Sequence, residues 1–264
     1  QRLVTISLDR LWPNDMLRNV KSVIASLLAR VTLNVLRDER VEQRVWEIVN
    51  APKHLERVPG NLTAELARRA TQQSAEYVER HMADVPAFDW RFDLLQHALA
   101  QADTGLYLEF GVEDGESINF IADHVSAVVH GFDSFQGLPE SWINGAPRGG
   151  MSTGGKLPPV RSNVALHPGW FENSLPTFVA EHRKERLAFV HVDCDLYSSA
   201  RTVFTCLGEQ IRSGTIIQFD EYFNYPGWQQ HEFKAFKEFV EQRELRYRYI
   251  GYVRTGYSVA VSIQ

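Results

Sequence analysis

Residues 106–117 read LYLEFGVEDGES, and this stretch gives the strongest indication of the fold. Its apolar half predicts a buried strand, and the acidic turn between Gly111 and Gly115 leads into the start of a helix. Glycines at such a turn let the backbone approach a ligand closely, and the absence of lysine from the turn argues against a polyphosphate. We therefore expect a loop that binds a cationic or hydroxylated ligand, with an ordinary strand-to-helix turn as the alternative.

A second strand is expected at residues 128–132, and it ends at Asp133. This aspartate follows the glycine loop by roughly 20 residues, the spacing at which doubly wound nucleotide-binding folds place the carboxylate that holds a ribose diol. Asp133 is therefore the candidate ribose ligand, and a helix cap is the alternative.

Two later strands also end in acidic residues: Asp193 follows one, and Asp220 and Glu221 follow the next. If these strands are neighbours, their carboxylates converge at the edge of the sheet where open α/β folds bind ligands. Mg²⁺ would relieve their repulsion and suits oxygen ligands, whereas Zn²⁺ favours His and Cys. The pattern predicts a magnesium site, with capping and surface solvation as the alternative. Cys194 should point into the core, because side chains alternate along a strand.

In this order of motifs the chain resembles the macrocin and mycinamicin sugar O-methyltransferases over about residues 86 to 230. After the glycine loop, the resemblance is carried by DSFQGLP (133–139), HPGWFENSLP (167–176), HVDCDLY (191–197) and IIQFDEY (216–222). Those enzymes are class I methyltransferases that use S-adenosylmethionine and a divalent metal ion. The resemblance implies the same cofactors here, with a small-molecule glycoside or diol-bearing acceptor.

The resemblance also implies roles for individual residues. The methionine part of the cofactor would contact Glu109, Gly111 and Gly115, the ribose Asp133, and the adenine Gly169, Trp170 and Phe171, with Ser117 and Ser134 as further cofactor contacts. Asp193, Asp220 and Glu221 would bind Mg²⁺. The sequence departs from the family in two ways: Glu113 and Asp114 stand where an aromatic or basic pair is common, and Glu221 stands where Asp is common.

The expected reaction is in-line transfer of a methyl group to a hydroxyl of a sugar or a glycosylated natural product. Coordination to Mg²⁺ would lower the pKa of that hydroxyl and orient it. Asp193 is the first candidate for the base that takes the proton. His231, ten residues after Glu221, is the second, and a surface or capping histidine is its alternative.

Composition indicates the size of the core, the class of partner and the cellular compartment. The 264 residues are 44% hydrophobic, enough for one sizeable core, and the net charge of −5 argues against nucleic acid as a main partner. Two cysteines are too few for a disulfide framework and favour a reducing cytoplasm. The chain begins with Gln1 and not with Met, so both a fragment of a longer protein and a whole chain are left open.

Residues 1–100 read as a helical extension or cap, and residues 101–264 as the S-adenosylmethionine-binding domain. By similarity to the family, the extension would cover the active site and form a homo-oligomer. Within it, residues 20–36 predict an amphipathic helix that is too short and too charged to span a bilayer, with a membrane-surface role as the alternative. The Gly- and Pro-rich stretch 139–162 is expected to be a lid over the substrate.

Near the C-terminus, a helix is expected over residues 198–211, and two β-rich runs, 246–253 and 257–263, predict an antiparallel hairpin. Strands and helices that alternate before such a hairpin indicate the Rossmann-like class I methyltransferase fold, a mostly parallel sheet with an antiparallel edge. Two rival functions remain. A nicotinamide-dependent oxidoreductase would require GxGxxG, which the loop lacks, and a non-catalytic scaffold protein would keep the fold without the chemistry.

Overall fold

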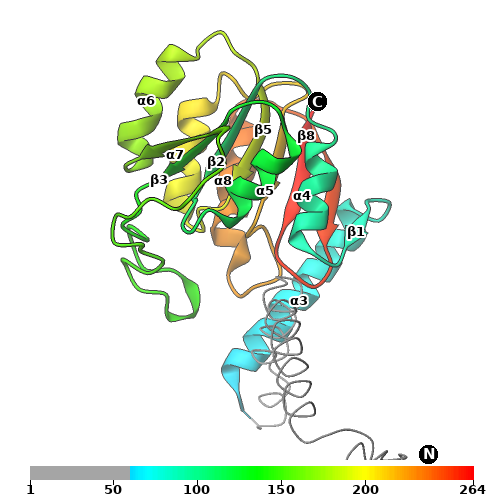
Figure 1. Cartoon of the computed structure of the whole chain (residues 1–264). Coiled ribbons are helices and arrows are strands. Elements are labelled where there is room, and N and C mark those ends of the chain that lie inside the picture. Colours follow the sequence, from blue (N-terminus) through cyan, green and yellow to red (C-terminus); the bar gives the residue numbers. More distant parts are fainter. Residues whose placement is uncertain (1–59) are drawn as a thin grey trace, which may run out of the picture. The chain divides into compact units, whose positions relative to one another are not determined.

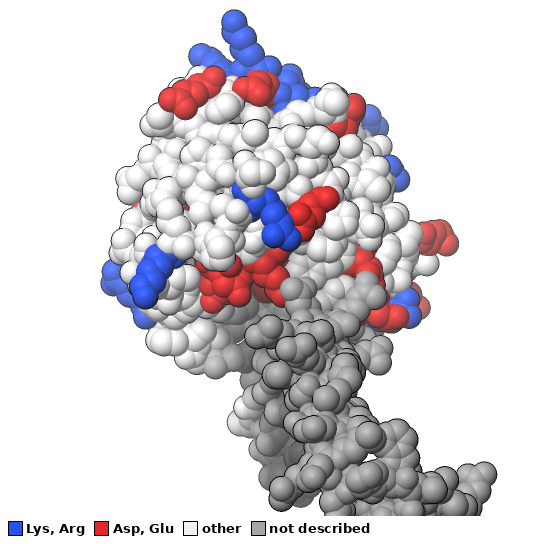
Figure 2. All heavy atoms as spheres, in the orientation of Figure 1, with Lys and Arg blue, Asp and Glu red and all other residues white. Residues whose placement is uncertain are grey.

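The computed structural model describes residues 60–264, of which Asn61–Gln264 form one compact unit (Figure 1). The expectations for residues 1–59, including the amphipathic helix at 20–36, lie outside the described residues. In the described part, no helix is both long and apolar enough to cross a membrane. Charged residues of both signs appear on the visible face of this unit in Figure 2, with acidic side chains gathered near its lower edge.

An eight-stranded sheet runs through the unit in the order β1-β7-β8-β6-β5-β2-β3-β4. The strands are β1 (Ala87–Phe88), β2 (Leu106–Phe110), β3 (Val129–Asp133), β4 (Val164–Pro168), β5 (Leu187–Val192), β6 (Ile216–Phe219), β7 (Tyr247–Val253) and β8 (Val259–Ile263). Neighbouring strands are parallel, except that β8 runs antiparallel to both β6 and β7. The predicted Rossmann-like class I methyltransferase fold, with its C-terminal hairpin, is confirmed.

Helices cover both faces of the sheet (Figure 1). The helices of the described part are α3 (Leu62–His81), α4 (Arg91–Leu99), α5 (Glu116–His124), α6 (Phe171–Glu181), α7 (Tyr197–Leu207) and α8 (Glu232–Gln242), with single 3₁₀ turns η3 (Ile143–Gly145) and η4 (Trp228–Gln230), and α3 projects from the edge of the sheet (Figure 1). One core cluster joins α4 and α5 to the sheet, and the other joins α6, α7 and α8 to it. The helix expected over 198–211 is α7, which ends at Leu207, immediately before Gly208, a poor helix former.

The central strands are buried along their whole length, as expected for parallel strands covered on both faces. Their register aligns Val192 of β5 with Phe219 of β6, so the expectation that these two strands are neighbours is confirmed. The residues that follow them, Asp193 and Asp220, therefore emerge side by side at the carboxyl edge of the sheet.

Gly111 lets β2 and β5 end close together. A Cβ atom at this position would lie 1.7 Å from the backbone oxygen of Asp193, and the φ angle of +92° is one that other residues rarely adopt. Gly115 then begins α5 in the left-handed conformation, with φ +86°. The two glycines of the loop thus serve the backbone geometry, and they leave the helix N-terminus open toward the sheet edge.

Candidate functional site

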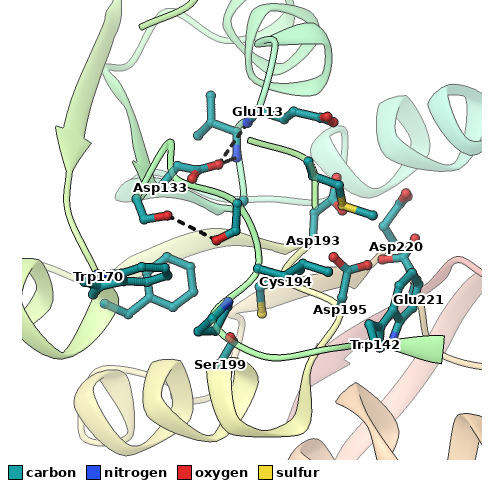
Figure 3. Close-up of a pocket in the computed structure, with 18 of the residues that line it drawn as sticks. Glu113, Asp133, Trp142, Trp170, Asp193, Cys194, Asp195, Ser199, Asp220 and Glu221 are labelled. Carbon is teal, nitrogen blue, oxygen red and sulfur yellow. Dashed lines mark hydrogen bonds between the residues drawn. The ribbon is translucent and has the colours of Figure 1, made fainter. Parts of the chain in front are cut away.

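A cavity of about 530 Å³ lies at the carboxyl ends of β2, β3, β5 and β6 (Figure 3). Its size and position fit a small-molecule site of an open α/β sheet. The structure brings together ten of the predicted site residues in its wall: Gly111, Ser117, Asp133, Ser134, Gly169, Trp170, Phe171, Asp193, Asp220 and Glu221. Three others, Glu109, Gly115 and His231, do not line it.

Asp133 fastens the glycine loop to the end of β3. Its Oδ2 atom accepts the backbone N–H groups of Val112 and Glu113 at 2.8 and 2.9 Å, and its Oδ1 atom accepts that of Phe135 at 2.7 Å. These bonds fix the carboxylate at the cavity wall (Figure 3). Oδ2 thus has both of its lone pairs occupied, whereas Oδ1 keeps one that a ligand hydroxyl could use, so the role of Asp133 as ribose ligand stays a prediction.

Glu109 is fully buried beneath the loop. Its Oε1 atom accepts a hydrogen bond from the Ser117 hydroxyl and lies 3.2 Å from Nδ1 of His191, which β5 places opposite it in the sheet. Ser117 lines the cavity, whereas Glu109 lies behind it and does not line the cavity itself. In this geometry Glu109 positions the first turn of α5, and direct contact with the cofactor stays a prediction.

The residues expected near the adenine form another part of the wall. Gly169 donates its backbone N–H to the backbone oxygen of Asp133 at 2.8 Å, which ties the turn after β4 to the end of β3. Trp170 caps α6, and the ring of Phe171 packs edge-on against Phe110, with centroids 5.5 Å apart. An aromatic wall of this kind suits a flat ring.

Carboxylate oxygens of Asp193, Asp220 and Glu221 all lie within 4.8 Å of one another. Burial, followed by the charge of Asp220, raises the pKa values of Asp193 and Glu221 well above the usual range. Oε2 of Glu221 is buried and has no hydrogen-bond partner among the described residues. An orphaned oxygen beside two further carboxylates is a donor set that fits Mg²⁺.

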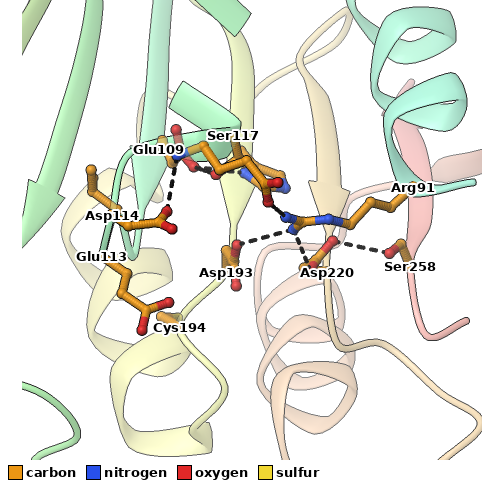
Figure 4. Close-up of polar contacts among 12 residues, drawn as sticks. Arg91, Glu109, Glu113, Asp114, Ser117, Asp193, Cys194, Asp220 and Ser258 are labelled. Carbon is orange, nitrogen blue, oxygen red and sulfur yellow. Dashed lines mark hydrogen bonds and ion pairs between the residues drawn. The ribbon is translucent and has the colours of Figure 1, made fainter. Parts of the chain in front are cut away.

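Arg91, which sequence reasoning missed, enters this acidic cluster from the start of α4 (Figure 4). Nη1 lies 3.1 Å from Oδ2 of Asp220 and 3.9 Å from Oδ2 of Asp193, and Nη2 pairs with Glu116. Burial opposes the charged form, but the carboxylates outweigh it and raise the pKa of Arg91. Nothing in the sequence marks this arginine, because its partners lie far along the chain.

Asp195 and Glu232 are further residues that the sequence analysis did not assign to the site. Asp195 lines the cavity in a left-handed conformation, with φ +60°. Oε1 of the fully buried Glu232 holds it there by accepting the backbone N–H groups of Cys194 and Asp195 at 3.1 and 3.0 Å. Burial, then the charges of Asp220 and Glu113, raise the pKa of Asp195 to about 7. Strand alternation could not have identified Asp195, because β5 ends at Val192, three residues earlier.

The segment expected to be a lid contributes Pro139, Trp142 and Met151 to the cavity wall. It is tied to α7, where the hydroxyl of Ser198 donates to Glu140 at 2.6 Å. The Trp142 ring packs edge-on against His231, with centroids 6.3 Å apart. His231 therefore contacts a wall residue without lining the cavity itself, and burial lowers its pKa.

Comparison with known proteins agrees with the architecture. The family described as "Methyltransferase domain" matches residues 108–222. The solved structure of CalS11, a calicheamicin methyltransferase, is 20% identical with a TM-score of 0.52, and the match covers 78% of this chain and 93% of CalS11. The solved structure of the O-methyltransferase NovP is 20% identical with a TM-score of 0.48, and the match covers 65% of this chain and 78% of NovP. None of the curated proteins compared with the chain matches it. The likeness to CalS11 supports the fold described above.

Proposed function

We propose that the protein is an S-adenosylmethionine-dependent O-methyltransferase that methylates a hydroxyl of a sugar or glycosylated natural product with the assistance of Mg²⁺. One observation carries this proposal: the carboxylates of Asp193, Asp220 and Glu221 border the same cavity as the glycine loop and Asp133. A donor set for a hard cation thus adjoins the surface expected to hold the cofactor. The sugar class of the acceptor is supported by the resemblance of the sequence motifs.

The cofactor would be held by the part of the cavity wall that the first strands form. Asp133 and Ser134 would bind the ribose, Trp170 and Phe171 would border the adenine, and the loop at Gly111 would lie against the methionine part. S-adenosylmethionine supplies the methyl group. Because Asp133 also fixes the loop, the same carboxylate would shape the site and bind the ligand.

The acceptor would lie between this wall and the acidic cluster. Mg²⁺ bound by Asp193, Asp220 and Glu221 would act as a Lewis acid that makes a hydroxyl more acidic. The acidic cluster and Trp142 both line the cavity (Figure 3), so these side chains would orient the acceptor and limit access of water.

The proton of the hydroxyl must pass to the protein. Asp193 remains the first candidate, because it lines the cavity, whereas His231 does not line it and packs against the wall residue Trp142.

Calorimetry with S-adenosylhomocysteine, followed by mass spectrometry of glycosides incubated with S-adenosylmethionine, tests the proposal. We expect binding of the nucleoside and a methyl-sized mass gain that requires Mg²⁺. Absence of S-adenosylhomocysteine binding would contradict the cofactor assignment. Equal methylation in excess EDTA would contradict the assistance of the metal but not the methyl transfer.

From the resemblance we also propose that the protein is a cytoplasmic homo-oligomer that takes part in the biosynthesis of a natural product. Light scattering after size-exclusion chromatography tests the association. A monomer at micromolar concentration would contradict it.

A further inference from the structure

Arg91 is a tethered cation inside the acidic cluster. Its side chain is only 24% exposed, and its guanidinium group lies among Asp220, Asp193 and Glu116 (Figure 4). Two of these partners belong to the candidate metal ligands, and the third, Glu116, does not. The arginine therefore binds the same oxygens that a divalent ion would need.

At Asp220, Arg91 and a divalent ion would compete for the same carboxylate oxygen. Its Oδ1 atom accepts a hydrogen bond from the hydroxyl of Ser258 at 3.0 Å, and its Oδ2 atom faces Nη1 of Arg91 at 3.1 Å. The oxygen not bonded to Ser258 is thus the one that Arg91 holds. A guanidinium group and a divalent cation repel each other strongly at such separations in a partly buried site.

We propose that Arg91 is a built-in competitor for the metal site, which a divalent ion must displace from Asp220 and Asp193 and which Glu116 retains after displacement. The inference rests on the proposed metal-assisted function and concerns how that site is filled. Without the ion, Arg91 offsets the repulsion between the carboxylates, so the protein keeps the ligands close together. With the ion, the pairing of Nη2 with Glu116 lets the guanidinium group leave Asp220 and stay paired.

Binding of Mn²⁺, followed by electron paramagnetic resonance without cofactor or acceptor, tests this competition. We expect Arg91→Gln to bind Mn²⁺ roughly tenfold more tightly than the wild type, because the competing charge is gone. Arg91→Lys keeps the charge and should stay within about threefold of the wild type. Arg161→Gln is the matched control, since Arg161 pairs with Asp123 on the surface, and it should leave Mn²⁺ affinity unchanged.

The retaining role of Glu116 gives a second arm that does not depend on the folding of Arg91→Gln. Glu116→Gln should weaken Mn²⁺ binding about threefold to tenfold in the wild type, because Arg91 then has only the metal ligands as partners. In the Arg91→Gln background the same change should have an effect of less than about twofold. Equal weakening in both backgrounds would mean that Glu116 acts on the ion directly, which contradicts the retaining role.

The outcomes separate the inference from the function on which it rests. Equal or weaker Mn²⁺ binding by Arg91→Gln, with clear binding by the wild type, overturns the competition and leaves the metal-assisted function standing. Absence of Mn²⁺ binding by every variant overturns both. Unchanged Mn²⁺ affinity in Glu116→Gln overturns the retaining role even if Arg91→Gln does not fold.

Discussion

Oδ2 of Asp133 accepts the backbone N–H of Val112 at 2.8 Å, although the two residues lie 21 positions apart in the chain. The carboxylate expected to bind the ribose is therefore also the group that holds the glycine loop against β3. Loss of this side chain should affect both the ligand and the fold.

We expect Asp133→Ala to weaken S-adenosylhomocysteine binding by about 1.5–3 kcal/mol, as for loss of charge-assisted hydrogen bonds. It should also lower the free energy of unfolding by about 2 kcal/mol, because three backbone N–H groups lose their acceptor. Calorimetry and urea denaturation measure the two effects. Asp123→Ala, at a surface ion pair with Arg161, is the control. Unchanged affinity in a folded variant would remove Asp133 from the cofactor site.

Asp220→Asn should abolish Mg²⁺-dependent methyl transfer and leave S-adenosylhomocysteine affinity within about threefold, because the ion would act on the acceptor while other strands hold the cofactor. Turnover and calorimetry on the same preparation measure this. Ser258→Ala, which removes only the hydrogen bond to Oδ1 of Asp220, should keep most of the activity. Full turnover by Asp220→Asn would assign the acidic cluster a structural role.

Gly111→Ala should prevent stable folding or lower the free energy of unfolding by more than about 3 kcal/mol. Its Cβ atom would overlap the backbone oxygen of Asp193 at 1.7 Å, and neither backbone segment can move without opening the sheet edge. Gly154→Ala is the matched control: its φ is +68°, but no atom lies within 4 Å of the added Cβ, so it should lose only about 1–2 kcal/mol. Similar losses in urea denaturation would show that the close approach is unimportant.

Acid should destabilise the protein through His130. Burial, then the neighbouring His167 and His182, lower its pKa from 6.5 to about 4, whereas Glu185 acts in the opposite direction. Below pH about 6.5 His130 is protonated in the unfolded chain, whereas in the folded protein it stays neutral until about pH 4. The contribution of neutral His130 to the free energy of unfolding is therefore complete above pH about 6.5. It is lost as the pH falls toward 4, by about 1–2 kcal/mol after allowance for solvent screening.

Urea denaturation at pH 7 and pH 5 tests this, and His130→Asn should lose less stability between the two than the wild type. The exposed His124, changed to Asn, is the control. If the free energy of unfolding falls equally in His130→Asn and in the wild type between pH 7 and pH 5, another group is responsible for the acid sensitivity.

Tyr249→Phe should loosen the attachment of α3. The Tyr249 hydroxyl lies 2.5 Å from that of Tyr77 on α3, 2.8 Å from that of Tyr222 and 3.3 Å from that of Tyr247. Its removal takes this partner from the hydroxyls of Tyr77 and of the fully buried Tyr222, so we expect a loss of about 1–3 kcal/mol and faster amide hydrogen exchange in α3. Tyr107→Phe, which loses one bond to the backbone of Asp103, should leave exchange in α3 unchanged. Unaltered exchange in Tyr249→Phe would contradict this role.

Much of the fold could be predicted because the signals are local. The apolar run before Gly111 indicates a buried strand, and the hairpin before the C-terminus follows from two β-rich runs around a short turn. The gathering of Asp193 and Asp220 was also predictable, since parallel strands end at one edge of the sheet. Residues at the carboxyl ends of parallel strands can therefore be assigned to the cavity before their hydrogen-bond and ion-pair partners are known.

Local patterns in the sequence specify the alternation of strands and helices along the chain, the backbone turn at Gly111 and the acidic character of the sheet edge. They do not specify that Arg91 enters the acidic cluster, that Glu232 holds the backbone at Asp195, or that Glu109 lies beneath the cavity wall, because these contacts arise from the fold. The difference lies in the separation of the interacting residues along the chain. Periodicity and turn chemistry act over a few residues, whereas the Arg91–Asp220 pair spans 129 positions and forms only after the order of strands in the sheet is established.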